Sequence, residues 1–197
     1  MKKRLLAVLL TLAIVLGMIV VPAYATEEET EIPAGYCQHC KSVIPENEWL
    51  AWDETDTVPR TGHYYLTRDV AGQTNQIIIN LDDDLLRNTV CLDLRGKTYT
   101  VSGVRAFLIY GVFSVMDTVG GGEFAVTGAT GAHGAFAMLG KNSNSKNGSG
   151  ELNIYSGTLR RINTPTEKVA YGGLIYNSTG GTLNVYGGTL IGGNVVP

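Results

Sequence analysis

The most compact group of reactive side chains in this chain is the segment Cys37-Gln-His-Cys40. Two cysteines separated by two residues can ligate a metal ion or close a disulfide. A zinc site would need two further ligands, and the sequence offers His39, His63 and Cys91 as donors. Three interpretations stay open: a structural disulfide or inert thiols, which we favour, then zinc, then redox chemistry.

Carboxylates are the next candidates for chemistry. Asp93, Asp117 and Glu123 could lie at neighbouring outward positions of stacked strands, with Arg95 or Lys97 nearby. A lyase would use such acids to hold Ca²⁺, and a hydrolase would need two carboxyls about 5 to 9 Å apart. Outward carboxylates are also ordinary on a solvated sheet. We therefore expect no catalytic site and keep these three residues as the candidates if one exists.

Two further groups could bind ligands. The run 82–84 is Asp-Asp-Asp and could hold a cation such as Ca²⁺, although we favour an exposed acidic turn. Tyr155 and Tyr186 could stack outward as a platform for a sugar ring, although a cross-strand aromatic ladder that only supports the sheet is favoured. The chain contains no G-x-S-x-G, H-E-x-x-H or G-x-G-x-x-G motif. The sequence therefore contains none of these motifs to indicate an enzyme class.

The elements that position these residues are short strands. From residue 90 onward, apolar and polar residues alternate in short segments bounded by glycine, and no segment has the apolar spacing of a helix. The segment Glu151–Leu159 returns as Thr182–Leu190, 31 residues later. A second strand is expected in each unit, over 106–110, 135–139 and 174–177. Such repeats predict a solenoid whose units bury their apolar faces against one another.

Alternation predicts which side chains stack. Three inward ladders are expected: Leu92, Phe113, Leu152 and Leu183; Leu94, Val115, Ile154 and Val185; Tyr99, Phe124, Leu159 and Leu190. Two outward ladders are expected beside them: Asp93, Ser114, Asn153 and Asn184; Arg95, Met116, Tyr155 and Tyr186. Of the 25 glycines, 19 lie after Tyr110, where they would form the corners between strands.

The first 25 residues predict export. A basic start, an apolar run and an Ala-x-Ala end are typical of a cleaved signal peptide, and an uncleaved anchor would be the only membrane contact. Cleavage would leave 172 residues and change the net charge from −3 to −6, because three basic residues are lost. Residues 26–35 are expected to form a flexible acidic segment, 36–89 a small irregular cap and 90–197 the repeats. The composition excludes a strongly basic nucleic-acid binder, a multi-span membrane protein, collagen and a disulfide scaffold.

Several segments together resemble one family. They are YCQHC (36–40), GHYYLTRDV (62–70), VCLDLRGKTYTV (90–101), FSVMDTVGGG (113–122) and LNIYSGTL (152–159). They are similar to the N-terminal part of exported right-handed parallel β-helix proteins from Gram-positive, largely gut-type bacteria. The resemblance implies an all-β fold, a pectate-lyase-like coil of about three to four rungs here, and no particular activity.

These observations predict a secreted or cell-surface protein. We expect a non-catalytic β-helix that serves as an adhesin, a stalk or a glycan-binding scaffold, with a surface glycan or a host or bacterial surface molecule as partner and no nucleic acid. The alternative is a polysaccharide lyase or glycoside hydrolase, or a fragment of one, which only fold analogy supports. The last repeat has no second strand, so its edge is expected to need further rungs or a partner.

Overall fold

The structure is a computed structural model, and it describes residues 33–80, 88–128, 136–140, 149–162, 173–178 and 180–192. All of them belong to one compact unit that spans Ile32–Pro197. The expected signal peptide, the acidic segment up to residue 32, the aspartates 82–84 and residues 193–197 lie outside the described residues. Among the residues described, no helix has the length and the apolar character that crossing a membrane requires.

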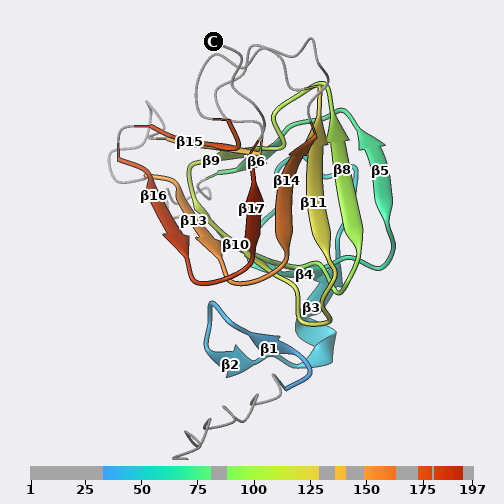
Figure 1. Cartoon of the computed structure of the whole chain (residues 1–197). Coiled ribbons are helices and arrows are strands. Elements are labelled where there is room, and N and C mark those ends of the chain that lie inside the picture. Colours follow the sequence, from blue (N-terminus) through green and yellow to red (C-terminus); the bar gives the residue numbers. More distant parts are fainter. Residues whose placement is uncertain are drawn as a thin grey trace, which may run out of the picture. The chain divides into compact units, whose positions relative to one another are not determined.

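The described chain is a parallel β-helix, as the sequence predicts (Figure 1). Its first sheet contains β3 (Trp49–Ala51), β4 (Gly62–Tyr65), β7 (Thr89–Asp93), β10 (Val112–Met116), β13 (Glu151–Ile154) and β16 (Thr182–Val185). Its second sheet contains β5 (Val70–Gln73), β8 (Thr98–Ser102), β11 (Glu123–Thr127), β14 (Thr158–Ile162) and β17 (Thr189–Ile191). Its third contains β6 (Ile77–Ile79), β9 (Phe107–Ile109), β12 (Ala137–Leu139) and β15 (Ile175–Asn177).

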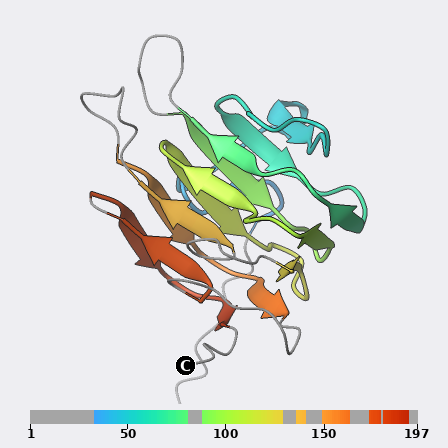
Figure 2. The same ribbon diagram turned by 90° about the horizontal axis from the view of Figure 1, so that it is seen from above.

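The rungs follow one another in chain order, from cyan through green and yellow to red in Figure 2. Each of the four rungs from β4 to β15 contributes one strand to each sheet, so the inward side chains of all three sheets meet in one core. Aromatic rings fill its centre, where Phe107 lies 4.3 Å from Phe113 and 5.1 Å from Phe124 between ring centroids. Full burial of such a side chain stabilises the fold by about 1.5–3 kcal/mol.

Most of the predicted ladders are confirmed. Phe113, Leu152 and Leu183 are register partners, and Val115, Ile154 and Val185 form the next ladder. The third ladder, from Tyr99 through Phe124 and Leu159 to Leu190, is also as predicted. The strands expected over 106–110 and 174–177 are β9 and β15, and β12 occupies the described part of 135–139.

The predicted register of the rung around residue 92 is wrong by two residues. Val90, not Leu92, pairs with Phe113, and Leu92 pairs with Val115. Leu94 lies beyond the end of β7, where its amide donates to the carbonyl of Met116 at 2.8 Å. Because side chains alternate with a period of two, this shift keeps every residue on its predicted face. It changes only which residues are neighbours.

The outward ladders change accordingly. Cys91, and not Asp93, is in register with Ser114, Asn153 and Asn184. Toward the N-terminus the same ladder continues through His63 to Trp49. Asp93 pairs with Met116, and Arg95 lies beyond β7. The corrected register therefore places a cysteine and a histidine side by side on the outward face.

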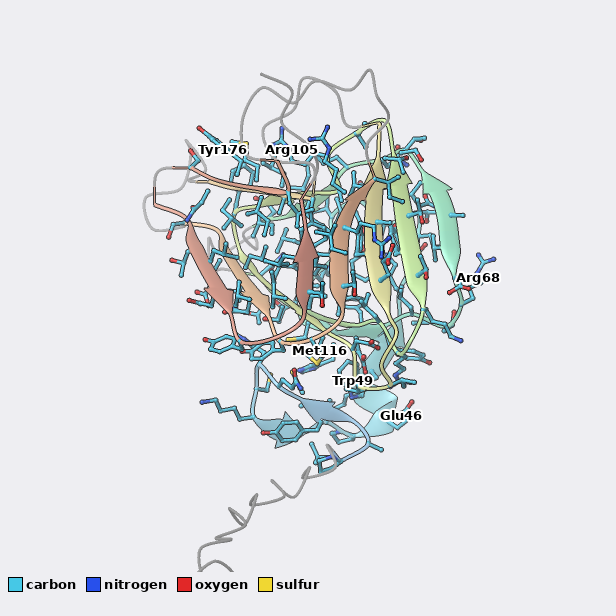
Figure 3. The ribbon with its side chains drawn as sticks, in the orientation of Figure 1. Glu46, Trp49, Arg68, Arg105, Met116 and Tyr176 are labelled. Atoms are coloured by element: carbon cyan, nitrogen blue, oxygen red, sulfur yellow. The ribbon has the colours of Figure 1, made fainter. Side chains whose placement is uncertain are left out.

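The parallel coil also begins earlier than the predicted boundary at residue 90. The strands β4, β5 and β6, between residues 62 and 79, already pair in parallel with β7, β8 and β9. Ahead of them lie an antiparallel hairpin of β1 (Tyr36–Cys37) and β2 (Ser42–Val43) and the short 3₁₀ helix η1 (Glu46–Glu48). The hairpin packs on the outward face of the first sheet, because Cys37 clusters there with Trp49, Cys91 and Met116. Figure 3 labels Trp49 and Met116 near the hairpin.

The two ends of the coil differ in burial. At the start, Trp52 and Leu66 belong to the core, and Val70 and Ile77 are buried. At the other end the inward Leu183 and Val185 are 36% and 49% exposed, whereas the partners of the preceding strand are fully buried. The apolar core therefore reaches the surface at the last described strands.

Candidate metal centre

Three separate parts of the chain bring the cysteines and one histidine together. Cys37 ends β1, and Cys40 lies in the turn that joins β1 to β2. His63 lies on β4 and Cys91 on β7, where they are register partners. Adjacent strands are about 4.8 Å apart, and residues in register share a face, so the sheet itself sets the separation of His63 and Cys91.

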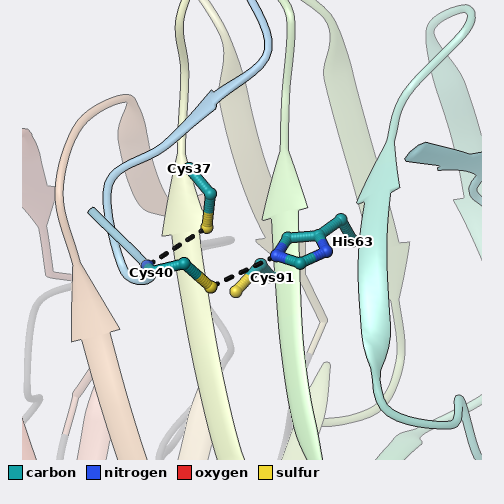
Figure 4. Close-up of side chains that lie close together, drawn as sticks. All are labelled: Cys37, Cys40, His63 and Cys91. Atoms are coloured by element: carbon teal, nitrogen blue, oxygen red, sulfur yellow. Dashed lines mark hydrogen bonds between the residues drawn. The ribbon is translucent and has the colours of Figure 1, made fainter. Parts of the chain in front are cut away.

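The four donor atoms form a tight cluster (Figure 4). The Sγ atoms of the three cysteines and a ring nitrogen of His63 all lie within 4.8 Å of one another. Cys40 Sγ and His63 Nε2 are 3.2 Å apart. The amide of Cys40 donates to Cys37 Sγ at 3.4 Å. All three cysteines are free thiols in the structure, so it contains no disulfide.

The turn around the Cys-x-x-Cys segment depends on an unusual backbone at Lys41. Its φ angle is 54°, in the left-handed region that glycine adopts most readily. This conformation follows Cys40 directly and lets Ser42 return to pair with Cys37. Lysine therefore occupies a position whose backbone suits glycine.

Burial differs among the donors. Cys37 and Cys91 are 0% and 1% exposed, whereas Cys40 is exposed and His63 is half-buried. The buried side chains of Trp49 and Met116 pack in the same cluster as the two buried cysteines. The Trp49 and His63 rings lie 5.3 Å apart between centroids, at an interplanar angle of 57°. The group is therefore exposed to solvent at Cys40 and His63.

The three thiols differ in acidity. The pKa of Cys37 falls to about 5, mainly because Cys91 donates a hydrogen bond to its sulfur, with the Cys40 amide contributing further. That hydrogen bond to Cys37, together with burial, raises the pKa of Cys91. Burial, followed by the neighbouring Cys37, raises the pKa of Cys40 to about 11. Of the three thiols, that of Cys37 is therefore the one whose pKa favours the thiolate, whereas the pKa shifts of Cys40 and Cys91 favour the protonated thiol.

The structure selects among the ligands that the sequence offers. It brings His63 and Cys91 to Cys37 and Cys40, and His39 is not part of this group within the described residues. Sequence reasoning kept Cys91 as a candidate but placed Asp93 in its ladder position. Aligning the apolar pair Val90 and Leu92 with Phe113 and Val115 would have supplied the correct register.

The three candidate catalytic carboxylates each make structural contacts. The buried Asp93 accepts hydrogen bonds from the Arg95 and Thr118 amides at 3.1 and 3.0 Å and from the Thr118 hydroxyl at 2.7 Å. Asp117 accepts from the amides of Gly96 and Gly122 at 2.7 and 2.6 Å. These two carboxylates hold the corners between the first and second sheets.

Glu123 lies at the start of β11, in the second sheet, where it forms an ion pair with Arg160 at 3.0 Å. Asp93 is the last residue of β7 in the first sheet, and Asp117 directly follows β10 of the same sheet. The expected outward row of acids along neighbouring rungs is thus divided between two sheets. Arg95 lies near Asp93, as expected, with its Nε 3.7 Å from the Asp93 carboxylate, and its guanidinium lies 3.8 Å from the centroid of the Tyr65 ring.

The tyrosine stack is as the sequence predicts. The rings of Tyr155 and Tyr186 lie 4.7 Å apart between centroids and are nearly parallel, at 10°. The Asn184 side-chain amide donates to Asn153 Oδ1 at 2.9 Å on the same two rungs. Tyr186 is 65% exposed, whereas Tyr155 packs partly against the cluster around Cys37 and Cys91.

Comparison of the chain with protein-family models, with curated proteins and with solved structures finds no match.

Proposed function

We propose that this chain is an exported, non-catalytic β-helix module that acts as a surface scaffold and binds glycan on the outward face of its first sheet. The observation that carries the proposal is the pair of matched side-chain ladders along β13 and β16 and the residue that follows each strand. Asn153 with Asn184 and Tyr155 with Tyr186 lie on one face of two neighbouring rungs.

These residue types suit a sugar ring. An aromatic face packs against the apolar C–H face of a pyranose, and side-chain amides hydrogen-bond its hydroxyl groups. Tyr186 offers the exposed ring, and Asn184 is half-buried beside it. The side-chain amide of Asn153 donates a hydrogen bond to Glu151 Oε1 at 3.0 Å. This bond orients the Asn153 amide within the ladder.

The carboxylates argue against turnover. Asp93 and Asp117 are buried, with their oxygens accepting hydrogen bonds from backbone amides, and Glu123 is paired with Arg160. A general acid or base has to reach a substrate proton from a solvent-accessible position. No pair of the three candidate carboxylates shares one open surface of the described coil, so a lyase or hydrolase gains no support from them.

The test is retention on immobilised pectin-type and mucin-type glycans, together with an assay for unsaturated products and new reducing ends. We expect retention without turnover, and about fivefold weaker retention for Tyr186→Ala, since stacking of one ring is worth about 1 kcal/mol. Tyr176→Ala, in β15 of the third sheet, is the matched control and should be retained like the unmodified chain. Product formation would support the enzyme, and absence of retention would contradict glycan binding.

A further inference from the structure

We propose that Cys37, Cys40, His63 and Cys91 bind one Zn²⁺ ion in a closed, structural site. The four donors are three sulfurs and one imidazole nitrogen, a ligand set that is typical of structural zinc. The inference goes beyond the proposed scaffold function and does not depend on it. It is argued from the geometry of one side-chain cluster.

The distances suit a tetrahedral ion. Zinc bonds of about 2.3 Å to sulfur and 2.0–2.1 Å to nitrogen place tetrahedral ligand atoms about 3.5–3.8 Å apart. The donor atoms here are within 4.8 Å of one another, and Cys40 Sγ and His63 Nε2 are already 3.2 Å apart. Side-chain adjustments of about 1 Å are enough to close the shell, with no change in the paired strands.

The composition of the cluster favours metal over a disulfide. A disulfide joins two of the three cysteines and leaves one thiol and the histidine without a role. Zinc uses all four residues, including His63, whose ring nitrogen lies against Cys40 Sγ. The four donors come from three separate segments of the chain, namely the β1–β2 hairpin, β4 and β7.

The chemistry of the donors suits a divalent cation. Zinc binds cysteine as a thiolate and histidine as a neutral imidazole, so its binding releases thiol protons to solvent and leaves three thiolates and one neutral imidazole around the ion. The amide of Cys40 already points at Cys37 Sγ, so the backbone donates toward the charge that the thiolates keep.

The surroundings assign the ion a structural role. Four protein ligands leave no open position for water or substrate, in contrast to a catalytic zinc site. The hairpin has strands of only two residues, too short to be stable alone. Zinc would tie this hairpin to β4 and β7 and so keep it on the outward face of the first sheet.

The test uses the purified chain, reduced and then supplied with ZnCl₂ or CoCl₂. We expect one zinc per chain by elemental analysis, and cobalt spectra with intense visible bands of tetrahedral geometry and a thiolate-to-cobalt charge-transfer band. His63→Ala should weaken zinc binding at least about tenfold, given that even outer-shell partners are worth 10- to 100-fold. His39→Ala, which alters the histidine inside the Cys-x-x-Cys segment, is the matched control and should bind like the unmodified chain.

Substitution of a partly buried ligand such as His63 could unfold the hairpin. Cys40→Ser therefore provides a second variant at an exposed ligand, and circular dichroism checks the folding of both variants. A folded Cys40→Ser chain should keep cobalt but lose part of the charge-transfer intensity, since one thiolate is gone. Uptake of less than about a tenth of a zinc per reduced chain overturns the proposal, as a rough threshold for a site of this class. Equal affinity of His63→Ala and His39→Ala also overturns it.

Discussion

His63 and Cys91 are register partners on adjacent parallel strands, and both project from the outward face of the first sheet. They are 28 residues apart in the sequence, and the ladder of the β-helix makes them neighbours. Across from them the β1–β2 hairpin supplies Cys37, at the end of β1, and Cys40, in the turn. One half of the cluster is therefore encoded by a local motif and the other half by the register of the coil.

Chelation should destabilise the zinc-loaded chain. Removing a ligand that binds only the folded state lowers the free energy of unfolding, by about 2.7 kcal/mol when the ligand stands at 100 times its Kd. For a chain of this size we expect Tm to fall by about 5–10 °C on addition of EDTA. Differential scanning calorimetry measures the shift. An identical Tm for the zinc-loaded chain with and without EDTA would contradict the structural role.

Lys41→Gly should stabilise the chain. The φ of 54° costs a lysine about 1 kcal/mol that glycine does not pay, partly offset by the greater freedom of glycine when unfolded. We expect the free energy of unfolding to rise by about 0.5 kcal/mol, as measured by urea denaturation. Lys41→Ala removes the same side chain without relieving the backbone, so it is the control and should not stabilise. A gain in both variants would indicate that the side chain, not the backbone, is responsible.

Asp117→Ala should be strongly destabilising. It leaves the amides of Gly96 and Gly122 without the carboxylate that accepts from both. Losing hydrogen bonds to a buried charged acceptor costs about 2–4 kcal/mol in total. Urea denaturation should show this loss, and the exposed Glu48→Gln should change stability by less than about 0.5 kcal/mol. If the Asp117→Ala chain were as stable as the unmodified chain, the structural role of this carboxylate at the corner would be contradicted.

Tyr155 should make the chain sensitive to alkaline pH. Burial, with Tyr186 contributing, raises the pKa of Tyr155 to about 12 in the folded state, above the value of about 10 in an unfolded chain. Between these pH values the unfolded state binds fewer protons than the folded state, so the free energy of unfolding falls as pH rises.

Tyr155→Phe removes this ionisation, so its stability should fall less steeply than that of the unmodified chain between pH 10 and 12. Urea denaturation at several pH values measures the slope. Tyr186→Phe, at the exposed member of the stack, is the comparison and should keep most of the steeper slope, because burial is the larger cause of the raised Tyr155 pKa. If both variants gave equal slopes, the alkaline sensitivity would not come from burial of Tyr155.

The fold was predictable because its signals are local and repeated. Alternation from residue 90 and the return of Glu151–Leu159 as Thr182–Leu190 predict stacked strands, and the ladder from Tyr99 to Leu190 is confirmed. The rung containing Cys91 was harder to place, because loops of unequal length separate the rungs. A shift of two residues keeps the alternation intact, so alternation alone does not set the register between rungs.

Only the local part of the cluster was predictable from the sequence. The Cys37 and Cys40 spacing is visible in one line of sequence, whereas the choice among His39, His63 and Cys91 depends on register and on how the hairpin folds back. His39 is nearest in sequence, yet it is not part of the group that the described residues form. Sequence distance is a poor guide to ligands that a sheet brings together.

Strand pairing holds His63 next to Cys91, so the geometry of the cluster does not depend on the number of residues between them in the sequence. The segment from the end of β4 to the start of β7 could gain or lose residues at its corners without altering the separation of the two side chains, provided that the strands stay in register. A search for this cluster in other chains should therefore compare rungs rather than count residues. A fixed spacing would identify only the Cys37 and Cys40 pair.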